Sequence, residues 1–231
     1  MAEPVPKEKR GQVNSTWVDQ ATRHKHFLRL HYREAVRELS VGERRAGARA
    51  VARRVALLSE FQRARVLGIF LPLSYEIDTA PLAVLARRAG KRLAVPVVFP
   101  DTGGMTFALL REGKPRLKKN VYGILEPDPP EWVEAMDLVV VPGASFTSRG
   151  DRLGAGAGYY DRFLAGHSRL KAVGVCFDEQ RAVRLPCEGH DRRVNIVVTP
   201  SFVSKTAPIP GSLLRAPSLI EGRRKTMGSN D

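Results

Sequence analysis

The sequence has little of several features that mark particular classes of protein. Only two cysteines, Cys176 and Cys187, occur among its 231 residues. We expect them to be reduced thiols rather than a disulfide framework. No apolar run approaches the roughly 18 residues that a bilayer-spanning helix needs. Residues 1–12 are charged and contain proline, and they lack the apolar stretch of a secretory signal. We therefore expect a cytoplasmic protein without a membrane partner.

Negative charge is scarce relative to positive charge. The chain has 38 Lys and Arg residues but 24 Asp and Glu residues, which gives a formal net charge of +14 and a pI near 10.4. Such a field attracts polyanions, including nucleic acids, nucleotides and polyglutamates. Much of the arginine lies between Arg23 and Arg54, where a solvated helix face explains it. Zinc-finger spacing, RNA-binding signatures and basic zippers are absent from the sequence, which argues against nucleic acid as the partner.

The remaining composition suits one α/β domain. The chain is 43% hydrophobic, enough for a single sizeable core. We expect residues 1–22 to form a flexible N-terminal arm and residues 23–203 to form the domain. Residues 204–231, rich in Pro, Ser and Arg, are predicted to be a disordered tail. We expect a monomer.

Hydrophobic periodicity predicts helices that alternate with strands. Helices are predicted from residue 25 onward, over 40–59 after a capping box of Ser40 and Glu43, over 79–89, and from Tyr159. Strands are predicted over 66–71, 92–98, 105–110, 137–142, 171–177 and 194–199, and residues 114–130 are predicted to be a loop. This alternation indicates an α/β fold with three layers, in which helices cover both faces of a mostly parallel, twisted sheet.

A glycine-rich loop over residues 142–161 follows a hydrophobic strand. Gly154, Gly156 and Gly158 alternate in it, which allows the backbone N–H groups to approach an anion. Arg149 and Arg152 add forked donors that suit phosphate oxygens. The spacing matches neither the P-loop nor the dinucleotide fingerprint. By itself it leaves a structural turn and a phosphate site equally open.

The complete loop sequence is more specific. It reads Arg-Leu-Gly-x-Gly-x-Gly-Tyr-Tyr-Asp-Arg over 152–162, after Val-Pro-Gly-x-x-Phe over 141–146. This string resembles the signature of the 5-formyltetrahydrofolate cyclo-ligase family. Three further elements resemble that family: Lys25 with Arg29 one helical turn later, Leu71 with 76–79, and 188–191. The resemblance covers roughly residues 23 to 200.

The resemblance implies an ATP- and magnesium-dependent enzyme. Members of this family convert 5-formyltetrahydrofolate into 5,10-methenyltetrahydrofolate, with release of ADP and phosphate. The formyl oxygen attacks the γ-phosphate, and N10 of the folate then displaces phosphate from the activated carbon. Phosphoryl transfer needs mainly positioning and charge neutralisation, so a protein nucleophile is not required.

The resemblance also implies roles for individual residues. The cations that neutralise the triphosphate, and therefore the catalytic residues, would be Lys25, Arg29 and Arg152. The loop would add nucleotide contacts from Gly150, Leu153, Gly154, Gly156, Gly158 and Tyr159. The folate would contact Leu71, Glu76, Tyr159 and Tyr160. Magnesium, a hard cation that prefers carboxylates, would be held by Asp161 and Asp191.

Each of these residues also has a plainer interpretation. Lys25 and Arg29 could be two more cations on an arginine-rich helix, and Asp161 could stabilise the first turn of a helix. Glu76 could be a loop carboxylate, and one of the two tyrosines could pack in the core. His190, beside Asp191, is expected to be a solvated loop histidine rather than a metal ligand.

One position departs from the family pattern. Family members usually carry Asp after the Phe of the Pro-Gly-x-x-Phe element, and here Thr147 follows Phe146. Thr147 brings no charge, so activity or substrate choice could change. Two alternatives therefore stay open: a related nucleotide-dependent ligase with another substrate, and a basic nucleic-acid-binding protein on the same scaffold. The positive charge also suits a polyglutamylated reduced folate as the small-molecule substrate.

Overall fold

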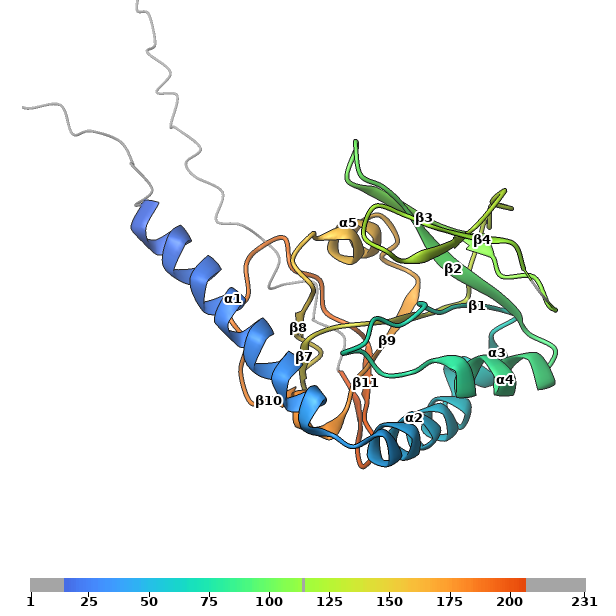
Figure 1. Ribbon diagram of the computed structural model, residues 1–231, viewed down its shortest axis with the longest axis horizontal. Coiled ribbons are helices and arrows are strands. Elements are labelled where there is room, and N and C mark those ends of the chain that lie inside the picture. The colour runs from blue at the N-terminus through green and yellow to red at the C-terminus, as the bar shows by residue number, and fades with distance from the viewer. Residues whose placement is uncertain (1–14, 114, 207–231) are drawn as a thin grey trace, which may run out of the picture.

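A seven-stranded sheet forms the centre of the protein. The computed structural model describes residues 15–113 and 115–206 (Figure 1). In the sheet the strands follow the order β12-β11-β9-β6-β1-β2-β3. Their bounds are β1 (Val66–Gly68), β2 (Arg92–Phe99), β3 (Gly104–Leu109), β6 (Leu138–Val141), β9 (Lys171–Val175), β11 (Ile196–Val198) and β12 (Val203–Lys205). The edge strands β3 and β12 pair antiparallel with their neighbours, and the strands between them run parallel.

Helices cover both faces of this sheet. They are α1 (Ser15–Glu38), α2 (Val41–Ala56), α3 (Ser59–Arg63), α4 (Ala80–Arg88) and α5 (Tyr159–Gly166). The predicted capping box at the start of α2 is confirmed, because the Ser40 side chain accepts the N–H of Glu43 and the Glu43 carboxylate accepts the N–H of Ser40. None of the helices in the described part of the chain is both long and apolar enough to cross a bilayer.

Alternating side chains of the strands build two separate cores. Leu138 and Val140 of β6 belong to a cluster that also contains buried residues of α2, α3 and α4. Val139 and Val141 of the same strand belong to a second cluster with residues of α5. Successive residues of a strand point to opposite faces, so one apolar strand serves both layers. The predicted three-layer α/β fold is confirmed, with α2 and α4 on one side of the sheet and α5 on the other (Figure 1).

The first helix begins earlier than the sequence pattern predicted. Helix α1 starts at Ser15 rather than near residue 25, so the end of the segment expected to be a flexible arm is helical. Residues 15–24 contain no Pro or Gly that would end a helix, which explains the extension. Residues 1–14 of the predicted arm lie outside the described residues. At the other end, β12 extends past the predicted domain boundary at 203, and residues 207–231 of the predicted tail lie outside the described residues.

The expectation of a plain loop over 114–130 is wrong. The strands β4 (Leu117–Lys119) and β5 (Leu125–Pro127) form an antiparallel hairpin in it. The turn is organised by Asn120, whose side-chain oxygen accepts the N–H groups of Tyr122 and Ile124. A second small sheet lies in the glycine-rich loop and beyond it, in the order β10 (Arg181–Ala182), β7 (Ser145–Thr147) and β8 (Arg152–Leu153).

The order of the strands creates a crevice beside β1 and β6. From β1 the chain passes through α4 to β2 on one side, whereas from β6 it passes through α5 to β9 on the other side. The segments that leave the carboxyl ends of β1 and β6 therefore diverge. In open α/β sheets such a switch point is where ligands bind. Glu76 follows the end of β1, and the glycine-rich loop follows the end of β6.

Candidate active site

Two adjoining pockets lie at this switch point. We call the first the apolar pocket: it has a volume of about 120 Å³, and its walls include Phe70, Leu71, Glu76, Val98, Tyr159 and Tyr160. We call the second the charged pocket: it has a volume of about 200 Å³, and its walls include Lys25, Arg29, Leu153, Gly156, Glu188 and Asp191. Four residues line both pockets: Arg152, Gly154, Gly158 and Asp161.

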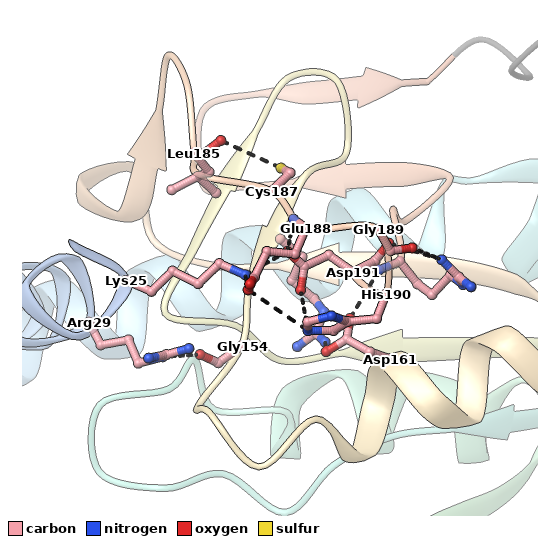
Figure 2. A network of polar contacts seen from close by, with 12 residues as sticks. Lys25, Arg29, Gly154, Asp161, Leu185, Cys187, Glu188, Gly189, His190 and Asp191 are labelled. Carbon is pink, nitrogen blue, oxygen red and sulfur yellow. Dashed lines mark hydrogen bonds and ion pairs between the residues drawn. The ribbon is translucent and has the colours of Figure 1, made fainter. Parts of the chain in front are cut away.

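Lys25 projects from α1 into the charged pocket (Figure 2). Its Nζ lies 2.5 Å from Glu188 Oε2 and 2.7 Å from Asp191 Oδ2, and the residue is buried. Burial opposes the charge on the amine, but the hydrogen bonds to Asp191 and Glu188 outweigh it and raise the pKa of Lys25. The plainer interpretation of Lys25 as a solvated helix cation is therefore wrong.

Arg29 lies one helical turn after Lys25 and contacts the glycine-rich loop. Its Nε donates a hydrogen bond to the carbonyl oxygen of Gly154 at 2.8 Å (Figure 2). Burial and the neighbouring Arg33 guanidinium lower the pKa of Arg29. Two residues four apart share one face of a helix, which is why both cations reach the same pocket. Thr22, inside the segment expected to be a flexible arm, lines this pocket as well.

Arg152 and Asp161 form a buried ion pair between the two pockets. Arg152 Nη2 lies 2.8 Å from Asp161 Oδ2, and both side chains are largely shielded from solvent. The other carboxylate oxygen of Asp161 accepts the N–H of Arg192 at 3.1 Å. Arg152 Nε is buried and has no hydrogen-bond partner among the described residues. A buried donor of this kind is costly unless a ligand satisfies it, so the pair fits a place where an anion binds.

The glycines of the loop have different structural roles. Gly154, Gly156 and Gly158 line the charged pocket together with Leu153. Gly158 has φ +70° and sits just before α5, so it directs the helix start toward the pocket. Gly150 lines neither pocket: it has φ +83°, and a Cβ there would collide with the Val194 carbonyl oxygen. Its observed contribution is to let the β7–β8 turn approach Val194.

The residues predicted to contact a folate line the apolar pocket. Leu71, Glu76, Tyr159 and Tyr160 all contribute to it. One Glu76 carboxylate oxygen accepts the N–H of Leu73 at 2.9 Å, and burial raises the pKa of Glu76 above its ordinary value. The hydroxyl of Tyr160 is buried without a hydrogen-bond partner among the described residues, and burial raises the pKa of this phenol. Both groups suit a ligand that supplies polar atoms.

The two predicted magnesium ligands both line the charged pocket. Burial tends to raise the pKa of Asp191, but hydrogen bonds from Lys25 and from the N–H of Glu188 outweigh it, so the pKa is lowered. Asp191 also belongs to a group with Glu188 and His190 whose possible ligand atoms lie within 4.8 Å of one another. Glu188 and Asp191 of this group offer the carboxylate oxygens that magnesium prefers, whereas Asp161 lies outside the group and is paired with Arg152. His190 itself is exposed.

Several residues in or beside the two pockets were not predicted from the sequence. Glu188 lies in the element 188–191 but had no predicted role, although it is one of the two acids that hold Lys25. Arg33 continues the four-residue spacing of Lys25 and Arg29, and its guanidinium lies 4.3 Å from the Tyr75 ring centroid at the apolar pocket. The four-residue spacing alone would have predicted that Arg33 shares a helix face with Lys25 and Arg29. Asn120 and Glu126 of the β4–β5 hairpin also line the apolar pocket, and no motif indicated them.

Comparisons with known proteins bear on this geometry. The family model described as the 5-formyltetrahydrofolate cyclo-ligase family matches residues 21–200. The 5-formyltetrahydrofolate cyclo-ligase of Escherichia coli (strain K12) is 32% identical over 177 residues, covering 74% of this chain and 97% of that protein. The mouse enzyme of the same name is 27% identical over 187 residues, covering 75% of this chain and 92% of that protein. The NMR structure of Aquifex aeolicus 5,10-methenyltetrahydrofolate synthetase has a TM-score of 0.68 and 30% identity, covering 84% of this chain and 98% of that one.

Proposed function

The chain belongs to the 5-formyltetrahydrofolate cyclo-ligase family, and from that premise we propose that it is an ATP- and magnesium-dependent 5-formyltetrahydrofolate cyclo-ligase. Its products are 5,10-methenyltetrahydrofolate, ADP and phosphate. The formyl oxygen takes the γ-phosphoryl group, and N10 of the folate then closes the ring as phosphate leaves. Neither step needs a protein nucleophile.

One observation carries this proposal: the two pockets meet at the Arg152–Asp161 ion pair. The apolar pocket suits a flat heterocycle, and the charged pocket suits a polyphosphate. A phosphoryl group that passes from one ligand to the other must be transferred where the two pockets join. Arg152 lies at that point with a buried donor that lacks a partner among the described residues, so it can neutralise charge on the transferred group.

Positive charge from two elements would hold the triphosphate. Lys25 and Arg29 approach from α1, and Arg152 approaches from β8. Backbone N–H groups between Gly154 and Gly158, beside the start of α5, add further donors. Magnesium would be held by Asp161 and Asp191, with Glu188 beside Asp191, and when bound it would supply additional neutralisation of the phosphates.

The apolar pocket would hold the pterin ring of the folate. The buried Glu76 carboxylate can accept hydrogen bonds from ring N–H groups, and the buried hydroxyl of Tyr160 can donate or accept one more. Leu71 supplies apolar contact, and Tyr159 supplies an aromatic face at the pocket wall. The positive charge of the protein would favour a polyglutamylated tail. Equal KM values for mono- and polyglutamate substrates at low salt would contradict that last point.

Thr147 does not favour a different substrate. This residue is buried, and it lines neither of the two pockets. Its departure from the family pattern therefore lies outside the walls of the two pockets. The position of Thr147 therefore gives no support to the alternative of a ligase with another substrate, and cyclo-ligation remains the function that the site supports best.

An omission series tests the proposal. Purified protein would be mixed with 5-formyltetrahydrofolate, ATP and magnesium, and the methenyl product would be followed by its absorbance. We expect product only when all three are present, and none from the Asp161→Asn variant. Folded parent protein that yields no product under these conditions would contradict the proposed function.

A further inference from the structure

Thr147 and Asp151 form a buried polar unit at the base of the glycine-rich loop. The Thr147 hydroxyl donates a hydrogen bond to Asp151 Oδ2 at 2.8 Å, and both residues are buried. The same hydroxyl oxygen accepts the N–H of Asp151 at 3.2 Å and that of Arg149 at 3.3 Å. The short turn between β7 and β8 is therefore organised around one side chain. Because the hydroxyl both donates and accepts, it can sit against a carboxylate.

Asp151 connects this turn to the segment that carries Asp191. Its second oxygen, Oδ1, lies 2.5 Å from Nε of Arg193, two residues after Asp191. The N–H of Val194 donates to the carbonyl of Gly150 at 3.0 Å, which adds a backbone bond beside the ion pair. Through these contacts the loop and the Asp191 segment are held against each other.

The position of the Asp191 segment affects two charged residues of the site, Lys25 and Asp161. Asp191 holds Lys25, and the N–H of the next residue, Arg192, donates to Asp161. A shift of this segment would move Asp191 relative to the loop and would disturb its contact with Lys25 and the contact of Arg192 with Asp161. Loss of a contact that orients a metal-binding residue commonly lowers metal affinity by about tenfold or more.

We propose that Asp151 is a positioning residue that holds the Asp191 segment on the glycine-rich loop, and that Thr147 is the matched donor that allows a carboxylate at 151. This inference deepens the proposed function and rests on it. The family resemblance leads one to expect an Asp at position 147, and here the acid lies four residues later, across the same turn. An acid at both positions would place two buried carboxylates at hydrogen-bond distance, which is unfavourable.

A double-variant cycle tests the coupling. Asp151→Asn removes the charge that holds Arg193, and Thr147→Asp brings a second acid against Asp151. We expect each single variant to raise the KM for magnesium-ATP on the order of tenfold, with a smaller change in kcat. The double variant removes the repulsion between two acids, because the amide introduced at position 151 can donate to the carboxylate introduced at position 147, but it still lacks the Asp151 charge that holds Arg193. We therefore expect its KM to be no higher than that of either single variant, whereas uncoupled sites would give additive losses.

Two further measurements make the result decisive. The dissociation constant of magnesium-ATP and the thermal unfolding midpoint can be measured for the same variants without cyclo-ligase turnover. The inference can therefore be judged even if the parent makes no methenyl product. If Thr147→Asp does not fold, Asp151→Asn combined with Arg193→Met replaces it. The proposal then expects the pair to be no worse than either single variant. Additive losses in either cycle, or an Asp151→Asn variant that binds nucleotide as well as the control Asp101→Asn, would overturn the proposal.

Discussion

The charged and apolar pockets differ in how their polar groups are satisfied within the protein. In the charged pocket, Lys25 lies between two carboxylates, and Arg152 is paired with Asp161. A phosphate that binds there would compete with protein carboxylates for Lys25 and for one Nη of Arg152. In the apolar pocket, Tyr160 has a buried hydroxyl without a partner among the described residues, and Glu76 is buried with one backbone donor. A ligand there gains hydrogen bonds without breaking ion pairs.

This difference has a consequence for substitutions. Removing one member of a buried ion pair leaves the other charge without compensation, so both stability and binding are affected. Removing a polar group from the apolar pocket affects mainly the ligand that would have contacted it. The comparison therefore predicts broad effects from the charged pocket and selective effects from the apolar pocket.

The largest effect is expected from Arg152→Met. This change removes the cation at the junction of the pockets and leaves Asp161 without its partner. We expect kcat to fall by about a hundredfold or more, as when one donor to a developing charge is lost. The thermal midpoint should fall as well. Arg63→Met, which replaces an exposed arginine of α3, is the control and should behave like the parent. A change confined to the KM for ATP would contradict the placement of Arg152 at the junction.

A more selective effect is expected from Glu76→Gln in the apolar pocket. The change removes a charged acceptor, which is worth about tenfold to a hundredfold in binding. We expect the KM for 5-formyltetrahydrofolate to rise by that factor while the KM for ATP stays within about twofold. Initial rates with each substrate varied in turn measure both constants, and Glu112→Gln at an exposed position serves as the control. Parallel increases in both constants would break the distinction between the pockets.

The protonation of Glu76 gives a second test of the apolar pocket. Burial raises the pKa of Glu76, so the carboxylate protonates at a higher pH than an ordinary glutamate. The KM for 5-formyltetrahydrofolate should therefore rise as the pH falls through this raised pKa, and the rise should be absent in Glu76→Gln. A raised pKa means that the protonated form stabilises the fold and that this contribution is lost as the pH rises. Glu76→Gln should accordingly unfold at a higher temperature than the parent at pH 7. An unchanged or lower midpoint would contradict the raised pKa of Glu76.

The smallest effect is expected from Glu188→Gln in the charged pocket. Under the proposed function Glu188 would compete with phosphate for Lys25, and its side chain is partly exposed to solvent. Its removal should lower the thermal midpoint slightly and tighten magnesium-ATP binding by at most about fivefold, the range of a partly screened ion pair. Titration calorimetry gives the dissociation constant. Much weaker binding would mean that Glu188 serves the bound metal rather than competing for the lysine.

Much of the fold was predictable because its signals are local. Strands such as β6 are continuous apolar runs, and the Ser40 capping box marks the start of α2 directly. The β4–β5 hairpin was missed because its strands are three residues long and Lys118 and Lys119 face solvent, so no apolar pattern marks them. The early start of α1 was missed because polar residues without a periodic apolar stripe do not separate a helix from an arm.

The candidate site was predictable as a set of residues but not as two pockets. Motif matching gave Lys25, Asp161 and Asp191, all of which line one pocket. It could not indicate that Lys25 is held by Glu188, since that contact joins positions 163 residues apart. The role of Thr147 was equally hidden, because its hydrogen bond to Asp151 depends on the turn between β7 and β8. Long-range pairing is set by the folded chain, and no short motif records it.

The most direct test of the central claim is the ratio of ADP formed to methenyl product formed, measured in the same reaction by chromatography and absorbance. If the two pockets meet at Arg152 and phosphate passes between their ligands, the parent should give equal amounts of both products and negligible ADP without 5-formyltetrahydrofolate. Steady ADP formation that is independent of the folate, or methenyl product without ADP, would contradict the account.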